Sequence, residues 1–252
     1  EAMANGSLSA IDQETFCSEY ERCLQQSLRE LPAHGAQRVL AEILAHQVRK
    51  LQTSYYEQHT HYQTRTRDWD APLEPRHLEF RFGPASRHSD ASEYPNSVDA
   101  PFSLTVESET IRFAGRIDRI DVGEIAGQVV FQIIDYKTSR RVRLQQAELN
   151  DGRSLQPTLY AIVAATLLGD GERPAIPLAC GYWGVQDKGF DKVSTIEMHT
   201  LEEGRLIPTK VWQELQTAVT RRVGQLVTGI RQGEFPMFPA DEKHCSRCEY
   251  RH

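Results

Sequence analysis

The segment 111–139, IRFAGRIDRIDVGEIAGQVVFQIIDYKTS, constrains the fold of this chain more than any other. Two runs of alternating apolar residues with glycines between them predict two β-strands joined by a turn. Successive side chains of a strand point to opposite faces, so Asp135 and Lys137 should share one face and Tyr136 should lie on the other. If the two strands pair antiparallel, Asp118 can lie near them. Two carboxylates and a lysine on one face could bind a divalent cation and a phosphate together.

A D-x-K triplet by itself is common at exposed strand ends, where it forms a solvated ion pair. Here the triplet has two companions, G-R-I-D-R-I-D from Gly115 and Q-P-T-L-Y from Gln156 to Tyr160. Taken in this order, they resemble the motifs G-x-x-D-R-I-D, D-Y-K-T and Q-x-x-x-Y of the RecB-like branch of the PD-(D/E)XK nucleases. The resemblance covers roughly residues 79–160 and extends more weakly to the C-terminus.

This resemblance implies an α/β fold with a restriction-endonuclease-like mixed central sheet flanked by helices. Asp118 and Asp135, with the carbonyl of Tyr136, would bind Mg²⁺ or Mn²⁺, hard cations that prefer oxygen ligands. Lys137 would position the attacking water or stabilise the transition state. The glutamine and tyrosine of Q-x-x-x-Y would complete the catalytic neighbourhood by steadying the DNA strand.

The implied activity is metal-dependent hydrolysis of DNA phosphodiester bonds. The chain would be the nuclease domain of an AddB/RecB-like helicase–nuclease, or a RecB-family exonuclease, in recombinational DNA repair. Its partners would be DNA and a helicase domain or partner subunit.

One expected element is missing. RecB-like members usually carry a histidine metal ligand in a G-x-x-x-H setting, on a helix well before the first core strand, whereas His34 precedes Gly35 here. We expect His46, His59 and His61 to be surface or capping residues, because they lack metal-ligand spacing. The chain therefore resembles the C-terminal nuclease piece of a longer protein.

Two other functional classes stay open. A degenerate nuclease fold could serve as a DNA-binding or scaffold module in a helicase complex, which the missing histidine favours and the intact D-Y-K-T disfavours. Alternatively, an enzyme of different chemistry could contain D-x-K by coincidence. In that case Asp118, Asp135 and Lys137 should not converge.

Two further features flank the predicted site. Arg140, Arg141 and Arg143 form the densest basic cluster of the chain, which is either a solvated turn or a set of phosphate contacts beside the metal. Upstream, Glu79 lies among alternating bulky residues. The family often carries a glutamate at this place.

The C-terminal tail contains a C-x-x-C formed by Cys245 and Cys248. In AddB-type members, such a tail resembles part of an iron–sulfur staple with one upstream cysteine and three C-terminal ones. The sequence stops at His252, before the last of these cysteines, and neither Cys17 nor Cys23 is a convincing upstream ligand. We therefore expect a cluster only in a full-length parent and none in this chain.

Apolar periodicity organises the remaining sequence. It predicts helices from Asp12, across 39–55, from a cap at Ser154 and across 210–231, and strands over 76–82 and 177–186. These elements suggest three parts: an N-terminal helical segment (1–75), a nuclease core with a C-terminal helix (76–233) and a cysteine-containing tail (234–252).

Composition limits the setting of the protein. Hydrophobic residues make up 39% and charged residues 25%, which is typical of a soluble globular chain. No apolar run is long enough for a membrane span and no signal peptide opens the chain. Five cysteines, an odd number, then favour the cytoplasm over a disulfide-stabilised fold. The net charge of −6 disfavours a sequence-tolerant DNA coat but not a nuclease, whose metal offsets its carboxylates.

Overall fold

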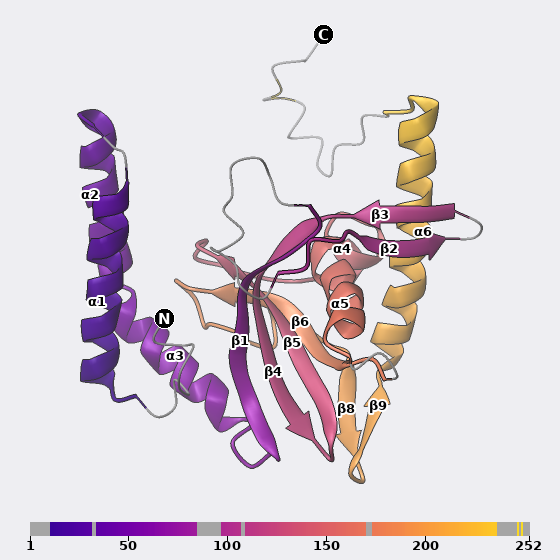
Figure 1. Ribbon diagram of the computed structural model, residues 1–252, viewed down its shortest axis with the longest axis horizontal. Coiled ribbons are helices and arrows are strands. Elements are labelled where there is room, and N and C mark those ends of the chain that lie inside the picture. The colour runs from indigo at the N-terminus through magenta and orange to yellow at the C-terminus, as the bar shows by residue number, and fades with distance from the viewer. Residues whose placement is uncertain are drawn as a thin grey trace.

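A five-stranded mixed sheet forms the centre of the computed structural model, which describes residues 11–31, 34–84, 97–106, 109–169, 173–235, 246 and 248 (Figure 1). The strands are β1 (Ala71–Phe82), β4 (Gly115–Ile125), β5 (Gln128–Lys137), β6 (Ile176–Gly184) and β7 (Thr195–Glu197), in that spatial order. Only β5 and β6 pair in parallel. The connection between these two strands crosses one face of the sheet, because parallel neighbours cannot be joined by a tight turn.

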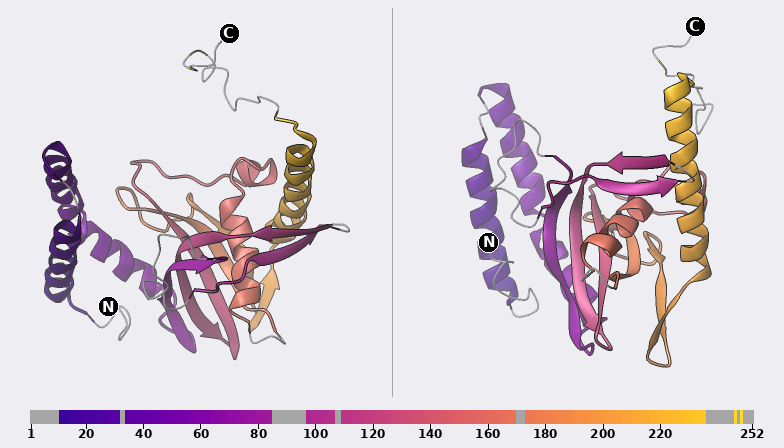
Figure 2. Two further views of the ribbon diagram at one scale, coloured as in Figure 1. Left: turned by 45° about the horizontal axis from the view of Figure 1, so that its top comes forward. Right: turned by 45° about the vertical axis from the view of Figure 1, so that its right-hand side comes forward.

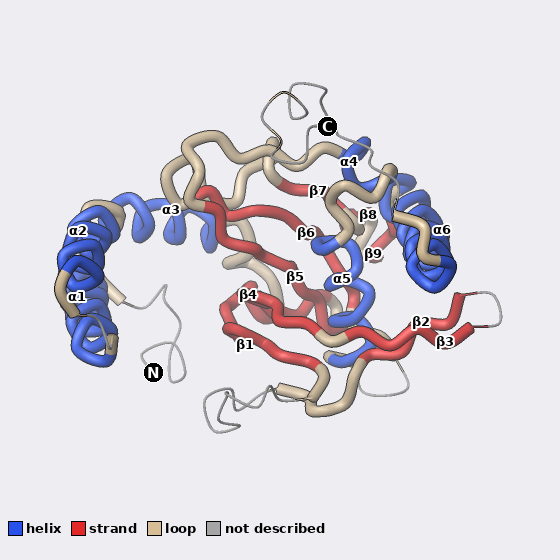
Figure 3. The backbone as a smooth tube through the Cα atoms, turned by 90° about the horizontal axis from the view of Figure 1, so that it is seen from above, coloured by secondary structure: helices blue, strands red, loops and turns tan. Residues whose placement is uncertain are grey.

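Helices cover both faces of this sheet (Figure 3). The crossover from β5 to β6 contains α4 (Gln146–Asn150) and α5 (Gln156–Leu167), and α6 (Lys210–Gln232) lies on the same side. On the opposite side lies α3 (Gln52–Thr64). The α/β fold predicted from the sequence, a restriction-endonuclease-like mixed sheet flanked by helices, is therefore confirmed.

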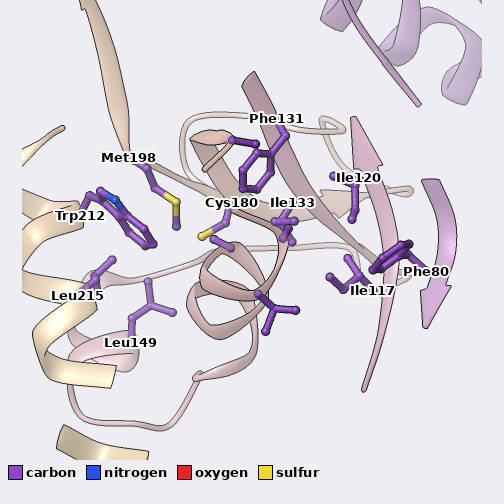
Figure 4. Close-up of a cluster of buried hydrophobic side chains, with 14 of the residues drawn as sticks. Phe80, Ile117, Ile120, Phe131, Ile133, Leu149, Cys180, Met198, Trp212 and Leu215 are labelled. Atoms are coloured by element: carbon purple, nitrogen blue, oxygen red, sulfur yellow. The ribbon is translucent and has the colours of Figure 1, made fainter. Parts of the chain in front are cut away.

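The main hydrophobic core fills the space between the sheet and the helices α4, α5 and α6 (Figure 4). Alternate residues Phe131 and Ile133 of β5 point into it, as does Ile120, the partner of Ile133 on β4. Met198 and Trp212 close the core beside α6. The side chains that alternate with these core residues point to the opposite face, where α3 covers them.

Two hairpins extend from this body (Figure 2). The first consists of β2 (Phe102–Val106) and β3 (Glu109–Phe113), and the second of β8 (His199–Glu202) and β9 (Arg205–Pro208). Ile111 of the first hairpin packs with Val219 and Val223 of α6. The apolar stripe of α6 therefore has two partners, the sheet core near its N-terminus and this hairpin further along.

The N-terminal helices differ from the prediction. Helix α1 (Gln13–Glu30) begins as predicted, because the Asp12 carboxylate accepts a hydrogen bond from the Thr15 amide at 2.8 Å. The single helix predicted over 39–55 is wrong: α2 (Ala36–Arg49) ends before Leu51, and α3 starts in a new direction. Helices α1 and α2 form a pair that stands away from the sheet.

Smaller differences concern the ends of elements. Strand β1 begins at Ala71 rather than at residue 76, so the first core strand starts within the predicted helical segment. Ser154 does not cap α5, whose N-cap is Leu155. Gly233 stops α6 as its periodicity indicates, in a left-handed conformation with φ 74°. In the described part of the chain, no helix is long and apolar enough to cross a membrane.

Candidate active site

The antiparallel pairing of β4 with β5 brings Asp118 to the end of β5. The ladder pairs Ile120 with Ile133 and Arg119 with Ile134. One residue beyond the ladder, the Oδ2 atom of Asp118 accepts a hydrogen bond from the backbone N–H of Tyr136 at 3.1 Å. Asp118 therefore lies against the middle of the D-Y-K triplet, as antiparallel pairing of the two predicted strands requires.

Asp135 and Lys137 are ion-paired at this strand end. The Asp135 side chain is only 13% exposed, whereas that of Lys137 is 40% exposed. Since the pair alternates with Tyr136 along the strand, both charged groups project toward the face that carries α5. The structure thus brings Asp118, Asp135 and Lys137 together.

The electrostatics of the group follow from burial and charge. Burial raises the pKa of Asp135 above its usual value, the ammonium of Lys137 opposes this shift, and the nearby charge of Asp118 adds to it. Burial also lowers the pKa of Lys137, but the hydrogen bond and charge of Asp135 outweigh it, so the pKa of Lys137 is raised. Lys137 is therefore protonated at neutral pH, and the site has an excess of negative charge that a cation would relieve.

Tyr182, which the motifs do not include, also belongs to the site. The parallel pairing of β5 with β6 places it opposite Asp135, and the Nζ atom of Lys137 lies 4.9 Å from the centre of its ring. Its hydroxyl is 2.7 Å from the hydroxyl of Ser154, just before α5. Sequence reasoning missed Tyr182, because alternation within one strand does not say which strand lies beside it.

Helix α5 carries the Q-x-x-x-Y pair to this face. Gln156 donates a hydrogen bond from Nε2 to the Tyr160 hydroxyl at 3.0 Å, and the Tyr160 ring packs edge-on against Phe82 at 6.0 Å. A Cβ atom at Gly115 would lie 2.8 Å from the Phe82 ring and 3.2 Å from the Tyr160 ring. The glycine of the G-R-I-D-R-I-D motif is therefore required by close packing of strand and helix.

Glu79 lies at the edge of the same group. It forms an ion pair with Arg116 at 2.9 Å, and its backbone has φ 53°, an unusual value for a glutamate. Burial raises the pKa of Glu79; the charge of Arg116 lowers it and that of Asp118 raises it. The Glu79 carboxylate is thus within electrostatic reach of Asp118.

The basic cluster is exposed beyond β5. Arg140, Arg141 and Arg143 are all exposed, while Val142 and Leu144 between and after them are buried. Backbone hydrogen bonds hold this segment to the body, from the Val142 amide to an Asp187 carboxylate oxygen at 3.1 Å and from the Leu144 amide to the Val193 carbonyl at 3.1 Å. The arginines therefore project from a fixed segment next to the carboxylates.

The opposite face of the same strands carries a buried polar cluster, which we call the reverse-face network: Tyr55, His59, Arg119, Asp121 and Tyr136. Arg119 and Asp121 are fully buried, and the guanidinium binds both carboxylate oxygens, at 2.5 and 2.6 Å. The expectation that His59 is a surface or capping residue is wrong, because it is 3% exposed and lies 3.1 Å from an Arg119 nitrogen. Burial and the charge of Arg119 lower the pKa of His59 to about 4.

The predicted cluster cysteines are only partly visible. Cys245 lies outside the described residues, and Cys248 is exposed and free of a disulfide. Cys17 is half-buried and Cys23 exposed, both on α1. The fourth, Cys180, is buried in the main core, where burial raises the pKa of its thiol strongly.

The donor set suits a small, hard cation. In the described residue ranges, no group of three or more His, Cys, Asp and Glu side chains is arranged to hold a metal. Asp118 and Asp135 alone can supply two carboxylates, and the strand end adds a backbone carbonyl. Mg²⁺ is commonly bound in this way, through one or two carboxylates with waters completing its octahedron.

Comparisons with known proteins agree with this geometry. The profile of the PD-(D/E)XK nuclease superfamily matches residues 7–252. An ATP-dependent helicase/deoxyribonuclease subunit of the AddB type from Carboxydothermus hydrogenoformans is 25% identical, over 58% of this chain and 17% of the relative. A protein of the same name from Exiguobacterium sibiricum is 38% identical, over 27% of this chain and 6% of that relative. The predicted resemblance to AddB-type proteins is confirmed, and the chain belongs to the PD-(D/E)XK nuclease superfamily.

Proposed function

We propose that this chain is the nuclease domain of an AddB/RecB-like helicase–nuclease that hydrolyses DNA phosphodiester bonds with Mg²⁺ or Mn²⁺. The observation that carries the proposal is the convergence of Asp118, Asp135 and Lys137 at the end of β5. The two curated relatives, named as helicase/deoxyribonuclease subunits, support DNA as the substrate and a helicase as the partner. Because the chain spans 17% and 6% of their lengths, those larger activities are part of the proposal.

The proposed roles divide between metal binding and charge stabilisation. Asp118, Asp135 and the carbonyl of Tyr136 would hold the cation. When bound, the metal would lower the pKa of a coordinated water and offset the charge that develops on the phosphate. Lys137 has a raised pKa and is protonated, so its ammonium is suited to stabilising negative charge on the phosphoryl oxygens rather than to accepting a proton.

Substrate positioning would fall to groups around this centre. Gln156 and Tyr160 lie on the α5 side of the site and would steady the DNA strand. Arg140, Arg141 and Arg143 would contact phosphates along the backbone, since exposed arginines provide affinity without reading sequence. Such contacts predict DNA binding that weakens steeply with salt.

Two further parts of the proposal concern the parent protein. We infer that it acts in the cytoplasm, where a DNA-repair nuclease meets its substrate. Cys245 and Cys248 would join further cysteines of a longer chain around an iron–sulfur cluster. Two thiolates cannot complete a four-cysteine site, so the chain of 252 residues should bind no cluster by itself.

A second candidate is a DNA-binding or scaffold module that has lost its activity. One observation favours it: the described residues contain no third His, Cys, Asp or Glu placed to complete a metal site. The ion-paired Asp135 and Lys137 argue against it, because a scaffold has no need for this pair beside Asp118.

Cleavage of linear double-stranded and single-stranded DNA with Mg²⁺, Mn²⁺ or excess chelator tests the proposal. We expect cleavage that stops on chelation, and loss of at least about a hundredfold in rate in Asp118→Asn, Asp135→Asn and Lys137→Met, the scale on which positioned catalytic groups contribute. Glu124→Gln is the matched control, because Glu124 is an exposed carboxylate at the far end of β4.

Full activity in Asp118→Asn or Asp135→Asn would refute the assigned roles. A wild-type chain that binds DNA but cleaves neither substrate with either metal would favour the scaffold function. Binding of Mn²⁺ to the wild-type chain, measured calorimetrically without DNA, separates these outcomes from simple misfolding.

A further inference from the structure

The reverse-face network has a feature that stability alone does not explain. Arg119 and Asp121 form an ion pair with both side chains fully buried. Removing two charges from water is costly, and well-packed apolar residues of similar volume commonly stabilise a core equally well or better. A buried pair of this kind is better explained by the position it imposes on its neighbours.

The neighbour that Arg119 orients is Tyr136, the middle residue of D-Y-K. The Nη1 atom of Arg119 donates hydrogen bonds to the hydroxyls of Tyr136 and Tyr55, at 3.1 and 3.2 Å. These two hydroxyls are also 2.8 Å apart, so they share a hydrogen bond. The Tyr136 side chain is therefore fixed at its tip by one residue of β4 and one of α3.

The backbone of Tyr136 contacts the opposite side of the sheet. Its N–H donates to Asp118, and its chain neighbours are Asp135 and Lys137. The tip of the Tyr136 side chain and the three charged groups of the candidate active site are thus joined through a single residue. A shift of the ring on one face moves the backbone that presents the charges on the other.

This link matters because the end of β5 is incompletely paired. In the described structure the β4–β5 ladder reaches only the Arg119–Ile134 pair, whereas β6 pairs with β5 as far as Lys137. On the β4 side, residues 135–137 are therefore held by side chains: Asp118 on one face and the tyrosine hydroxyls on the other.

We propose that Tyr55, Arg119 and the hydroxyl of Tyr136 are positioning residues that hold the end of β5 in the geometry needed to bind the catalytic cation. This inference rests on the proposed metal-dependent function, which it deepens by assigning the support of the metal ligands to the opposite face of the sheet. Asp121 acts one step further away, by fixing the Arg119 guanidinium through both of its carboxylate oxygens.

The test compares Tyr136→Phe with Tyr62→Phe, each of which removes one hydroxyl and keeps the ring. Tyr62 lies on α3 at the same face, but its hydroxyl donates to Gln132 at 2.9 Å and has no link to the strand end. Tyr55→Phe removes the other half of the hydroxyl pair and should resemble Tyr136→Phe.

Two measurements are made on each variant without DNA. Amide hydrogen exchange reports the hydrogen bond from residue 136 to Asp118, and calorimetry reports the affinity for Mn²⁺. In Tyr136→Phe and Tyr55→Phe we expect faster exchange at residue 136 and about tenfold weaker Mn²⁺ binding, the usual effect of removing a group that orients metal ligands. Tyr62→Phe should match the wild-type chain in both measurements.

The outcomes separate this inference from the proposed function. Unchanged exchange at residue 136 in Tyr136→Phe, or unchanged Mn²⁺ affinity despite faster exchange, would overturn the positioning role. An equal loss of affinity in Tyr62→Phe would overturn it as well, because any lost hydroxyl would then suffice. If the wild-type chain binds no Mn²⁺, the proposed function fails first, and this inference fails with it.

Discussion

Acidification should destabilise this protein through His59. The imidazole is buried against Arg119 and is faced by Asp121 on β4, by Tyr55 and Tyr62 on α3 and by Trp183 on β6. Burial first, and the charge of Arg119 second, lower its pKa from 6.5 to about 4, and Asp121 only partly opposes this shift. The folded protein therefore keeps this histidine neutral at a pH at which the unfolded chain protonates it.

The sign and size of the effect follow from proton linkage. Between pH 6.5 and about 4 the unfolded chain binds a proton that the folded chain does not, so stability is complete above this window and is lost as the pH falls through it. With these two pKa values, the contribution of His59 is about 2 kcal/mol smaller at pH 5 than at pH 8. A loss of this size is a substantial fraction of the stability of a typical domain.

Urea unfolding of wild type and His59→Gln at several pH values measures this term. Glutamine stays neutral and can still accept a hydrogen bond from Arg119, so the variant should lose less stability than the wild type between pH 8 and pH 5. Other groups titrate in this range, among them Asp135 and Glu79 with raised pKa values, but they are common to both proteins and cancel in the difference. His61→Gln, at an exposed position on the same helix, is the control. Equal pH dependence in wild type and His59→Gln would refute the reasoning.

Two further substitutions probe the packing on either side of β4. Asp121→Asn should cost about 3–5 kcal/mol in urea unfolding because it leaves the buried Arg119 charge uncompensated, whereas Arg119→Met combined with Asp121→Leu should recover most of this loss; equal losses in both would contradict the argument. Gly115→Ala should lower stability by about 1–3 kcal/mol in thermal unfolding, because its new methyl group meets the fully packed Phe82 ring, and a neutral result would show that the ring can move aside.

The sequence predicted the chemistry-bearing face well because that face depends on local rules. Alternation along β5 places Asp135 and Lys137 on one side, and hairpin pairing places Asp118 beside them. The reverse face could not be predicted in this way. His59 meets Arg119 across a separation of 60 residues, and periodicity within α3 gives no sign of that partner.

The N-terminal helices show the converse error. Val39, Leu40 and Ile43 repeat at helical spacing, which usually indicates a buried face, yet they are 60%, 56% and 51% exposed. Periodicity specifies which side of a helix is apolar but not whether anything covers it. The break before Leu51 was missed for the same reason, since the apolar register continues across it while the packing partner changes from α1 to the sheet.

The division of the motif between two faces decides how loss of activity should be interpreted. In D-R-I-D, the first carboxylate, Asp118, faces the candidate metal site, whereas Arg119 and Asp121 lie buried behind the sheet. In D-Y-K, the outer residues face the site and the Tyr136 hydroxyl joins the reverse-face network. A substitution behind the sheet can therefore abolish cleavage without touching substrate, either by unfolding the protein or by displacing the strand end. The Arg119→Met, Asp121→Leu double variant separates these causes: if it is stable but binds Mn²⁺ weakly, the network acts through position, and if it binds Mn²⁺ normally, its members contribute only to stability.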